Sequence, residues 1–183
     1  LDDRIIVSGA MQLTSVKVNS PATTANLGPG YDCLGMALDI WNTVEIRSTR
    51  SAGTRVVVNG MGSGELPEDE TNLVCRSMAQ VWRRTGYDAP PLEIICDNQI
   101  PLKRGLGSSS AAIVGGMVAA NLALGKPLSD ATLLKMVVEM EGHPDNVAPA
   151  LLGGLRIVGV EKGLPFTVPI SVPAGLMAVL FVP

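Results

Sequence analysis

The stretch PLKRGLGSSSAAIVGGMVAANLALG, residues 101–125, combines a glycine-rich turn with the start of a long apolar helix. Gly105 and Gly107 permit backbone conformations that other residues rarely adopt, and they let the backbone approach a ligand closely. The three serines that follow fall in the first helical turn, where about four backbone N–H groups lack partners. Aligned peptide dipoles add roughly half a positive charge there. The stretch therefore predicts an anion site at a helix N-terminus, for which phosphate is a typical ligand.

Two common phosphate-binding motifs do not fit this stretch. A Walker A loop has the pattern G-x-x-x-x-G-K-[ST], whereas the Gly-Lys pair of this chain, Gly125 and Lys126, is followed by proline. A dinucleotide fingerprint requires a third glycine three positions after the second, and Ser110 stands there. A serine-rich helix cap without a ligand is the alternative that the residues alone leave open. Lys103 and Arg104 favour phosphate because they add positive charge before the turn.

The composition predicts one domain of ordinary size with a substantial core. The chain has 183 residues, of which 46% are hydrophobic. No apolar run reaches the roughly 18 residues that span a bilayer, and no secretory signal opens the chain. The net charge is −3 and the basic residues are scattered, whereas nucleic-acid-binding proteins cluster them. We therefore expect a cytoplasmic protein that binds neither membranes nor nucleic acid.

The cysteines and the histidine restrict the chemistry further. Cys33, Cys75 and Cys96 are odd in number and far apart, which argues against a disulfide framework and against a zinc knuckle. They are typical of buried, reduced thiols in a cytosolic protein. His143 is the single histidine, so the chain cannot supply a site that needs two imidazoles.

The pattern of apolar residues predicts a mixed fold. Alternating or β-branched runs predict strands at 14–20, 41–49, 54–60, 91–100, 153–160 and 175–183, and helical periodicity predicts helices at 72–86, 108–124 and 130–142. We expect Thr71 and Ser129 to be N-caps, and Gly86 to end the first helix. This order of elements predicts the α+β class.

Two further segments carry dense polar side chains. The first, SPATTANLGPGYDCLGMALD at residues 20–39, has the composition of a tight loop after a strand. Asn26 and Asp32 are its candidates for contact with a polar ligand, and a turn without a ligand is the alternative. Cys33 has no nearby base that would lower its pKa, so we do not expect it to be a nucleophile.

The second segment, EMEGHPDNVAPALLGG at residues 139–154, gathers five such side chains within eight residues: Glu139, Glu141, His143, Asp145 and Asn146. Gly142 and Pro144 predict a turn rather than a continued helix. This density of oxygen and nitrogen ligands would suit Mg²⁺ and a substrate. A Ser-His-Asp hydrolase is disfavoured, because no G-x-S-x-G elbow is present and residues two apart, such as His143 and Asp145, rarely point at each other.

Together the three segments resemble the GHMP kinase superfamily. PLKRGLGSSSAA resembles its ATP-binding motif, P-x-x-x-G-L-G-S-S-x-A, while SPATTANLGPGYDCLG and HPDNVAPALLGG resemble its homoserine kinase branch. The resemblance covers about residues 16–183. It implies a two-layer α+β domain of the ribosomal protein S5 domain 2-like class. It also implies ATP-dependent phosphorylation of the L-homoserine side-chain hydroxyl to O-phospho-L-homoserine, in threonine biosynthesis.

The resemblance also implies residue roles. ATP would be bound by Pro101, Leu102, Lys103, Arg104, Gly105, Leu106, Gly107, Ser108, Ser109, Ser110 and Ala111, with Asn72, Leu73 and Val74 beside the adenine. Mg²⁺ would be bound by Ser109 and by Glu141 or Glu139, with Glu141 preferred. Asn26, Asp32 and His143 would hold homoserine. Asn146 would be catalytic, at the place where related kinases carry an aspartate base, and Asp145 is the remaining candidate for a base.

The resemblance divides the chain into three parts. Residues 1–12 would be an N-terminal extension or tag remnant, 13–175 the ATP-binding domain, and 176–183 the first strand of a C-terminal domain. Two other functions stay open: another small-molecule kinase of the superfamily, and a non-catalytic module with this fold that senses a nucleotide or a sugar. The partners implied are L-homoserine and ATP with Mg²⁺, and a homodimer is compatible with them.

Overall fold

A computed structural model of the chain describes residues 15–49 and 53–180. Its strands are β1 (Val16–Leu27), β2 (Gly30–Ser48), β3 (Arg55–Gly60), β4 (Leu92–Asn98), β5 (Leu155–Glu161) and β6 (Leu164–Ile170), and its helices are α1 (Leu73–Thr85), α2 (Ser108–Ala123), α3 (Asp130–Glu141) and α4 (Pro144–Leu152). The sheet has the order β3-β4-β2-β5-β6, and β1 pairs with β2. Only the β3–β4 pair is parallel. The predicted α+β class is confirmed.

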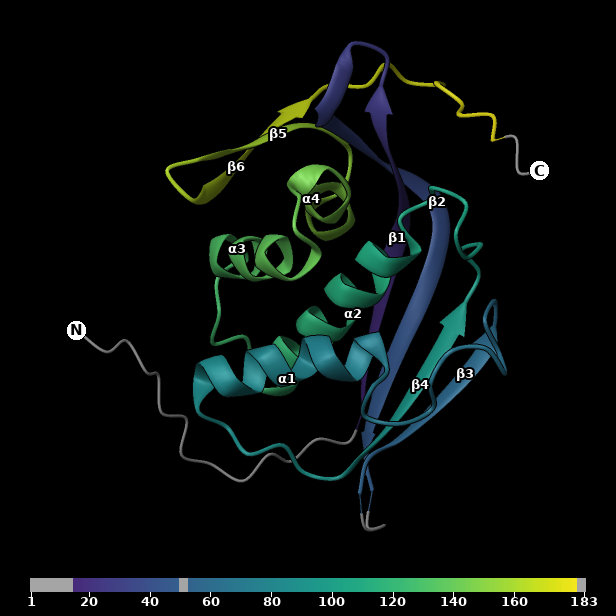
Figure 1. Cartoon of the computed structure of the whole chain (residues 1–183), viewed down its shortest axis with the longest axis vertical. Coiled ribbons are helices and arrows are strands. Elements are labelled where there is room, and N and C mark those ends of the chain that lie inside the picture. Colours follow the sequence, from purple (N-terminus) through teal and green to yellow (C-terminus); the bar gives the residue numbers. More distant parts are fainter. Residues whose placement is uncertain (1–14, 50–52, 181–183) are drawn as a thin grey trace.

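The four helices lie together on one side of strands β1 to β4 (Figure 1). Helix α2 is central: it contacts β1, β2 and each of the other helices. This position explains why its sequence is apolar all round, because a helix without a polar face must be buried. Ile46, Ile94, Met78 and Met117 are fully buried in the core between these layers. Within the described residues, no helix is long and apolar enough to cross a membrane.

Two glycines allow the elements around the N-terminal end of α2 to approach closely. A Cβ on Gly116 would overlap the Ser77 side chain, so this glycine lets α1 pack tightly against α2. A Cβ on Gly35 would overlap the carbonyl oxygen of Asp145, so the start of α4 lies directly against β2. The first turn of α1 is thereby held against the middle of α2, and the first turn of α4 against β2.

The helix boundaries confirm two of the three predicted caps. Ser129 caps α3 by accepting a hydrogen bond from the Thr132 N–H at 3.3 Å, and Gly86 ends α1 with a φ of 67°. The prediction that Thr71 is the N-cap of α1 is wrong. Its hydroxyl donates to Asp69 at 2.6 Å, and Asn72 caps the helix instead.

The segment 20–39 is not the tight loop that its composition predicted. It forms most of a long antiparallel hairpin, in which β1 and β2 pair from Val16 to Leu27 around a turn at 28–29. Two register shifts along β1 accommodate Pro21 and Asn26. Cross-strand pairing along the full length of the hairpin therefore overrides the turn-like composition of this segment.

The segment 139–154 contains the predicted turn and also a helix that was not predicted. Gly142, with a φ of 101°, ends α3, and α4 begins two residues later at Pro144. Proline suits the first helical position because its missing N–H would have no partner there. The turn thus directs a second helix, α4, back toward the sheet.

The predicted strand at 175–183 is wrong in its described part. Residues 175–180 form no strand and are exposed, and 181–183 lie outside the described residues, as does the predicted extension at 1–12. An extended segment becomes a strand only where it has a pairing partner, and β6 instead occupies the edge beside β5. The β5–β6 hairpin turns at Lys162 and Gly163, which both have positive φ, as in a type I′ turn.

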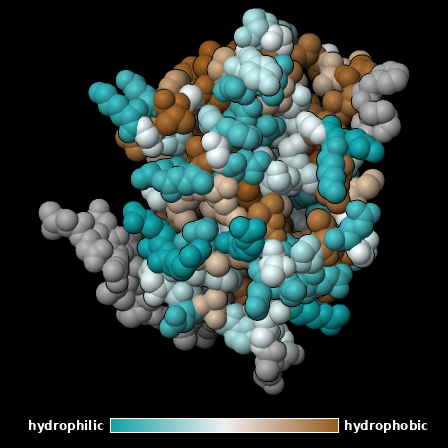
Figure 2. Space-filling view, viewed as in Figure 1, coloured by the Kyte–Doolittle hydropathy of each residue, from teal (hydrophilic) through white to brown (hydrophobic). Residues whose placement is uncertain are grey.

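Exposed hydrophobic side chains gather on this hairpin and on the segment after it. They are Ile157, Val160, Leu164, Phe166, Val168, Val172, Leu176, Met177, Val179 and Leu180. Figure 2 shows hydrophobic surface at the end of the molecule that carries β5, β6 and residues 172–180. Exposed apolar side chains gathered at one end of a molecule are typical of surface that another protein segment covers.

Candidate functional site

A cavity of about 660 Å³ lies at the N-terminal end of α2, between the start of α1, strands β2 and β4, and the glycine-rich turn. Of the residues expected to bind ATP, all but Ala111 line it: Asn72, Leu73, Val74, Pro101, Leu102, Lys103, Arg104, Gly105, Leu106, Gly107, Ser108, Ser109 and Ser110. Ala111 is fully buried in the core beneath them. Two segments far apart in the sequence therefore form one cavity.

The glycine-rich turn has the conformation that its glycines predict. Gly105 and Gly107 have φ values of 69° and 66°, in the left-handed region that favours glycine. Gly107 is the N-cap of α2, and no side chain caps that helix. The N–H groups of the first turn are consequently available to an anion in the cavity.

Two serine hydroxyls of this first turn meet a carboxylate from another helix. Ser109 and Ser110 each donate a hydrogen bond to Oε1 of Glu141, both at 2.9 Å. Ser110 is fully buried, and Glu141, the last residue of α3, lines the cavity. The start of α2 and the end of α3 thus bring a hydroxyl and a carboxylate together beside the phosphate loop.

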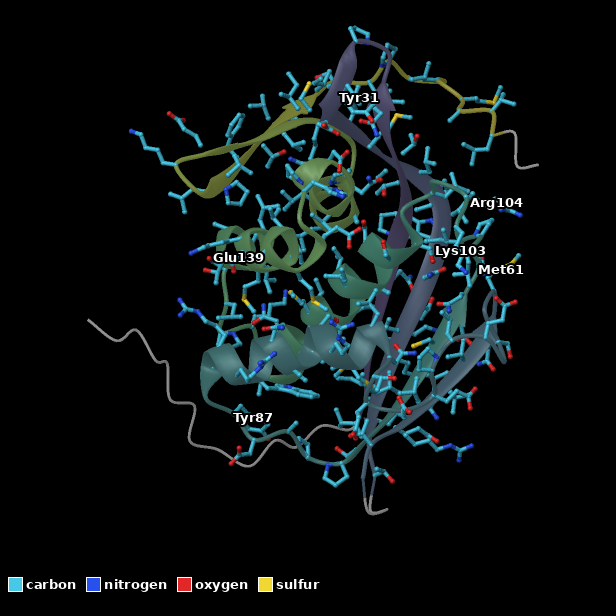
Figure 3. The ribbon with its side chains drawn as sticks, in the orientation of Figure 1. Tyr31, Met61, Tyr87, Lys103, Arg104 and Glu139 are labelled. Carbon is cyan, nitrogen blue, oxygen red and sulfur yellow. The ribbon has the colours of Figure 1, made fainter. Side chains whose placement is uncertain are left out.

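Glu139 lies in different surroundings. It lines a second cavity of about 420 Å³ between α1 and α3 and pairs with Lys135 at 3.7 Å. Figure 3 shows it on the outer side of α3, far from Lys103 and Arg104. Glu141 is therefore the carboxylate of this segment that lies with the serines.

The donor set around Glu141 fits Mg²⁺ bound together with phosphate. Among the described residues, no three His, Cys, Asp or Glu side chains form a cluster that could hold a metal ion alone. Mg²⁺ is usually bound by one or two carboxylates, with waters and substrate phosphates completing its octahedron. One carboxylate and one hydroxyl beside an anion site meet that requirement.

The start of α4 contributes a hydrogen-bonded series of polar side chains. His143 Nδ1 lies 2.9 Å from Asp145 Oδ1, and Asn146 Nδ2 donates to the same oxygen at 3.3 Å. The expectation that His143 and Asp145 would point apart was wrong, because His143 is the extended N-cap of α4 and its side chain folds over the first turn. Asn146 lines the cavity, whereas the His143 side chain is 59% exposed and lies outside the cavity wall.

The hairpin tip brings Asn26, but not Asp32, into the wall of the cavity. Asn26 Oδ1 accepts a hydrogen bond from the backbone N–H of Asp32 at 2.9 Å, and both residues have positive φ. The Asn26 side chain therefore stabilises the turn, while the Asp32 side chain is exposed beside it. The hydrogen bond places Asn26 and Asp32 next to each other, but only Asn26 reaches the cavity wall.

Several residues of the site were not predicted. Asn42, Leu66, Pro67, Arg76, Cys96 and Asn98 also line the cavity. Asn42 accepts hydrogen bonds from the N–H groups of Gln99 and Ile100, both at 2.9 Å, and so holds the start of the glycine-rich turn. Cys96 and Asn98 are two positions apart on β4, so their side chains lie on the same face of the strand. This spacing, just before the glycine-rich turn, is the sequence signal that could have identified them.

Cys96 is chemically inert despite its position. Burial, with smaller contributions from Cys75 and Asp97, raises its pKa to about 12. Burial likewise raises the pKa of Cys75 to about 11, with smaller contributions from nearby acidic groups. Since the thiolate is the reactive form, neither thiol is a nucleophile at neutral pH.

Comparison with known proteins yields a family and a set of relatives. Residues 72–154 match the family model described as GHMP kinases N terminal domain. The chain is 45% identical over 168 residues to a homoserine kinase from Desulfitobacterium hafniense, which covers 92% of this chain and 56% of that protein. It is 47% identical over 171 residues to a homoserine kinase from Leifsonia xyli, covering 92% and 53%.

The fold agrees with these matches. The crystal structure of homoserine kinase from Cytophaga hutchinsonii superposes with a TM-score of 0.78 at 35% identity, covering 92% of this chain and 55% of that one. The chain spans about half the length of the curated relatives it matches.

Proposed function

Because the chain belongs to the GHMP kinase family, we propose that it is the nucleotide-binding part of a homoserine kinase. The reaction would transfer the γ-phosphoryl group of ATP to the side-chain hydroxyl of L-homoserine and give O-phospho-L-homoserine, a step of threonine biosynthesis in the cytoplasm. The observation that carries the proposal is the hydrogen bond from the Ser109 hydroxyl to Glu141 Oε1. It lies beside the N-terminus of α2, which no side chain caps. Identities of 45% and 47% to homoserine kinases support the choice of acceptor.

In this proposal the cavity holds ATP along its length. The N–H groups at the start of α2 and the glycine-rich turn bind the phosphates, with Lys103 and Arg104 adding positive charge. Asn72, Leu73 and Val74 lie in another part of the same cavity wall and would contact the adenine. A phosphate loop and a base pocket within one cavity are what a nucleotide requires.

Ser109 and Glu141 would hold Mg²⁺. When bound, the metal neutralises the charge that develops on the transferring phosphoryl group. In the structure, the Ser109 hydroxyl donates a hydrogen bond to Glu141. To bind Mg²⁺, this hydroxyl would rotate so that its oxygen faces the metal. Ser110, which donates to the same carboxylate oxygen, keeps Glu141 in place during that change.

Homoserine would bind beyond the phosphates, held by Asn26, Asp32 and His143. Asn146 lies in the cavity wall, but an amide does not accept a proton at neutral pH. The other candidate, Asp145, is only 4% exposed in its side chain and is hydrogen-bonded to His143. We therefore propose that positioning and charge neutralisation, rather than a general base, supply most of the catalysis.

The matched segments span only 56% and 53% of the lengths of these two relatives. We propose that a further domain packs on the exposed apolar side chains of β5, β6 and 172–180 and completes the acceptor site. A homodimer is compatible with this arrangement.

A reconstituted protein tests the proposed function. The chain is fused to the second half of the Desulfitobacterium hafniense homoserine kinase and assayed for ATP consumption with homoserine, serine, threonine and mevalonate. We expect Mg²⁺-dependent phosphorylation with homoserine preferred. Preference for mevalonate would assign the chain to another kinase of the family. Nucleotide binding without any transfer, in a folded fusion protein, would indicate a nucleotide-sensing module.

A further inference from the structure

We infer that Thr23 is a positioning residue that determines which end of the Asn146 side-chain amide faces the nucleotide cavity. The inference rests on the proposed function, because it concerns the terminal phosphate of the proposed nucleotide. Thr23 lies in β1 and has no exposed surface. It belongs to none of the residue sets that the motifs indicate for ATP, metal or homoserine.

Thr23 contacts two parts of the site at once. Its backbone N–H donates to the Leu106 carbonyl at 3.1 Å, which joins β1 to the glycine-rich turn. Its Oγ1 occupies the space that a Cβ on Gly107 would need. Its hydroxyl donates to Oδ1 of Asn146 at 2.9 Å, which joins the same residue to the first turn of α4.

These contacts orient the Asn146 amide. Its oxygen accepts from Thr23, and its nitrogen donates to Asp145 Oδ1 at 3.3 Å. Asp145 is held in turn by His143 Nδ1 at 2.9 Å. The amide oxygen thus lies on the Thr23 side and the amide nitrogen on the Asp145 side, so each end of the amide has a matching partner.

The orientation has a consequence for ligand binding. An amide nitrogen carries two N–H donors, and Asp145 accepts from one, so the second is available where Asn146 lines the cavity. A donor attracts a phosphate oxygen, whereas an amide oxygen would repel it. Because Thr23, which bonds to Asn146, also lies against Gly107 at the N-terminus of α2, this donor would serve the phosphate end of the nucleotide, where the terminal phosphate would lie. Without the Thr23 hydroxyl the amide oxygen loses its donor. The longer bond to Asp145, at 3.3 Å, then holds the amide alone, and its cavity-facing donor is less firmly fixed.

Two substitutions separate the hydroxyl from the shape of the side chain. Thr23→Val keeps the branched shape and removes the hydroxyl, whereas Thr23→Ser keeps the hydroxyl and removes the methyl group. Binding of ATP and of ADP, each with Mg²⁺, is measured by calorimetry on the 183-residue chain. We expect Thr23→Val to reduce the ATP-to-ADP affinity ratio by about 3- to 10-fold, the value of one net hydrogen bond. Thr23→Ser should change this ratio by less than about 2-fold.

A purely structural role predicts a different result. A packing defect would weaken ATP and ADP equally, leaving their ratio unchanged, and Thr23→Ser would show it as well. An unchanged ATP-to-ADP affinity ratio in Thr23→Val would therefore overturn the inference. An equal decrease of this affinity ratio in Thr23→Val and Thr23→Ser would overturn it as well.

The side-chain amide of Asn146 gives a second, ligand-free measurement. We expect its ¹H–¹⁵N signals to move in Thr23→Val and to keep nearly their wild-type positions in Thr23→Ser. Unchanged signals in Thr23→Val would overturn the inference. A wild-type chain that binds neither nucleotide would overturn the proposed function, and the amide spectrum would then decide alone whether Thr23 orients Asn146.

Discussion

Ser109 Oγ lies 2.9 Å from Glu141 Oε1, although the two residues are 32 positions apart and belong to different helices. The contact joins the first turn of α2, where N–H groups are available to an anion, to the last turn of α3. A carboxylate beside a phosphate site would repel the phosphate unless a cation lay between them. In the proposed function, this contact marks the place where Mg²⁺ would lie in the cavity.

Replacing Glu141 should remove the Mg²⁺ dependence of nucleotide binding. Glu141→Gln keeps the size of the side chain and removes its charge, so we expect it to weaken binding of ATP with Mg²⁺ by about 10-fold or more, the value of one charged hydrogen bond or ligand. Calorimetric titrations with and without Mg²⁺ measure this.

Glu139→Gln is the matched control for that experiment. It changes the same residue type two positions away, where the side chain pairs with Lys135 outside the nucleotide cavity. We expect it to leave binding unchanged. A strong loss in Glu139→Gln with a mild effect of Glu141→Gln would show that the metal ligand has been assigned to the wrong glutamate.

The two glycines of the turn should differ in their tolerance of a methyl group. Both have φ near 70°, so alanine at either costs about 1–2 kcal/mol of backbone strain. A Cβ at Gly105 meets nothing within 4 Å, whereas one at Gly107 overlaps Thr23 Oγ1. Gly107→Ala should therefore lose a further ~1–3 kcal/mol of unfolding free energy, as measured by urea denaturation. Equal losses in the two variants would contradict the described packing of Thr23.

Local sequence signals predicted the parts of the site that depend on local structure. The glycine-rich turn, the start of α2 and the Ser129 cap are determined by residues within a few positions of one another, and all were predicted. The α1 cap was misplaced by one residue, from Asn72 to Thr71, because both side chains are good caps and only the competing bond to Asp69 separates them.

Apart from the Thr71 cap and the His143–Asp145 contact, the features of the site that were missed depend on contacts that are distant in the sequence. The 20–39 hairpin depends on pairing between β1 and β2. Its small polar residues show no alternation of polar and apolar positions that would predict strands. The Thr23–Asn146 bond joins residues 123 positions apart, and no local pattern indicates it. Glu139 and Glu141 could not be separated by motif spacing alone. The end of α3 separates them, because residues two apart on a helix face nearly opposite directions.

The three thiols should differ in reactivity in a way that follows their burial. The expectation of three buried thiols is wrong for Cys33, which is exposed. Burial raises the pKa of Cys75 to about 11 and that of Cys96 to about 12. We expect a disulfide reagent at pH 8 to modify one thiol rapidly in the folded chain and all three after unfolding. Rapid reaction of two or three thiols in the folded chain would contradict the burial of Cys75 and Cys96.

The same shifts predict how stability depends on pH. A thiol whose pKa is raised in the folded state favours folding fully below the unfolded pKa, near 9. Its contribution is lost progressively as the pH rises from there through the folded pKa. The unfolding free energy should therefore fall between about pH 9 and pH 12, and it should fall less in Cys75→Ala or Cys96→Ala measured against its own value at pH 8. An equal slope in these variants and the wild type would assign the alkaline loss to other groups.

The last prediction concerns the acceptor. In the proposed function the Asp32 carboxylate pairs with the ammonium group of homoserine, and among the described residues no hydrogen bond holds that carboxylate in the turn, since Asn26 supplies the side-chain bond there. Asp32→Asn should therefore leave the melting temperature unchanged. In the fusion protein described above it should weaken homoserine binding by about 10- to 100-fold, the value of a charge-assisted bond.

Asn26→Ala is the informative companion to Asp32→Asn. It removes the oxygen that accepts the Asp32 N–H, so we expect it to lower the melting temperature as well as homoserine affinity. ATP affinity should stay nearly constant in Asp32→Asn, because the Asp32 side chain does not line the nucleotide cavity. If Asp32→Asn destabilises the fold and leaves homoserine affinity intact, Asp32 belongs to the turn rather than to the acceptor site, and the ammonium group must be bound by another carboxylate.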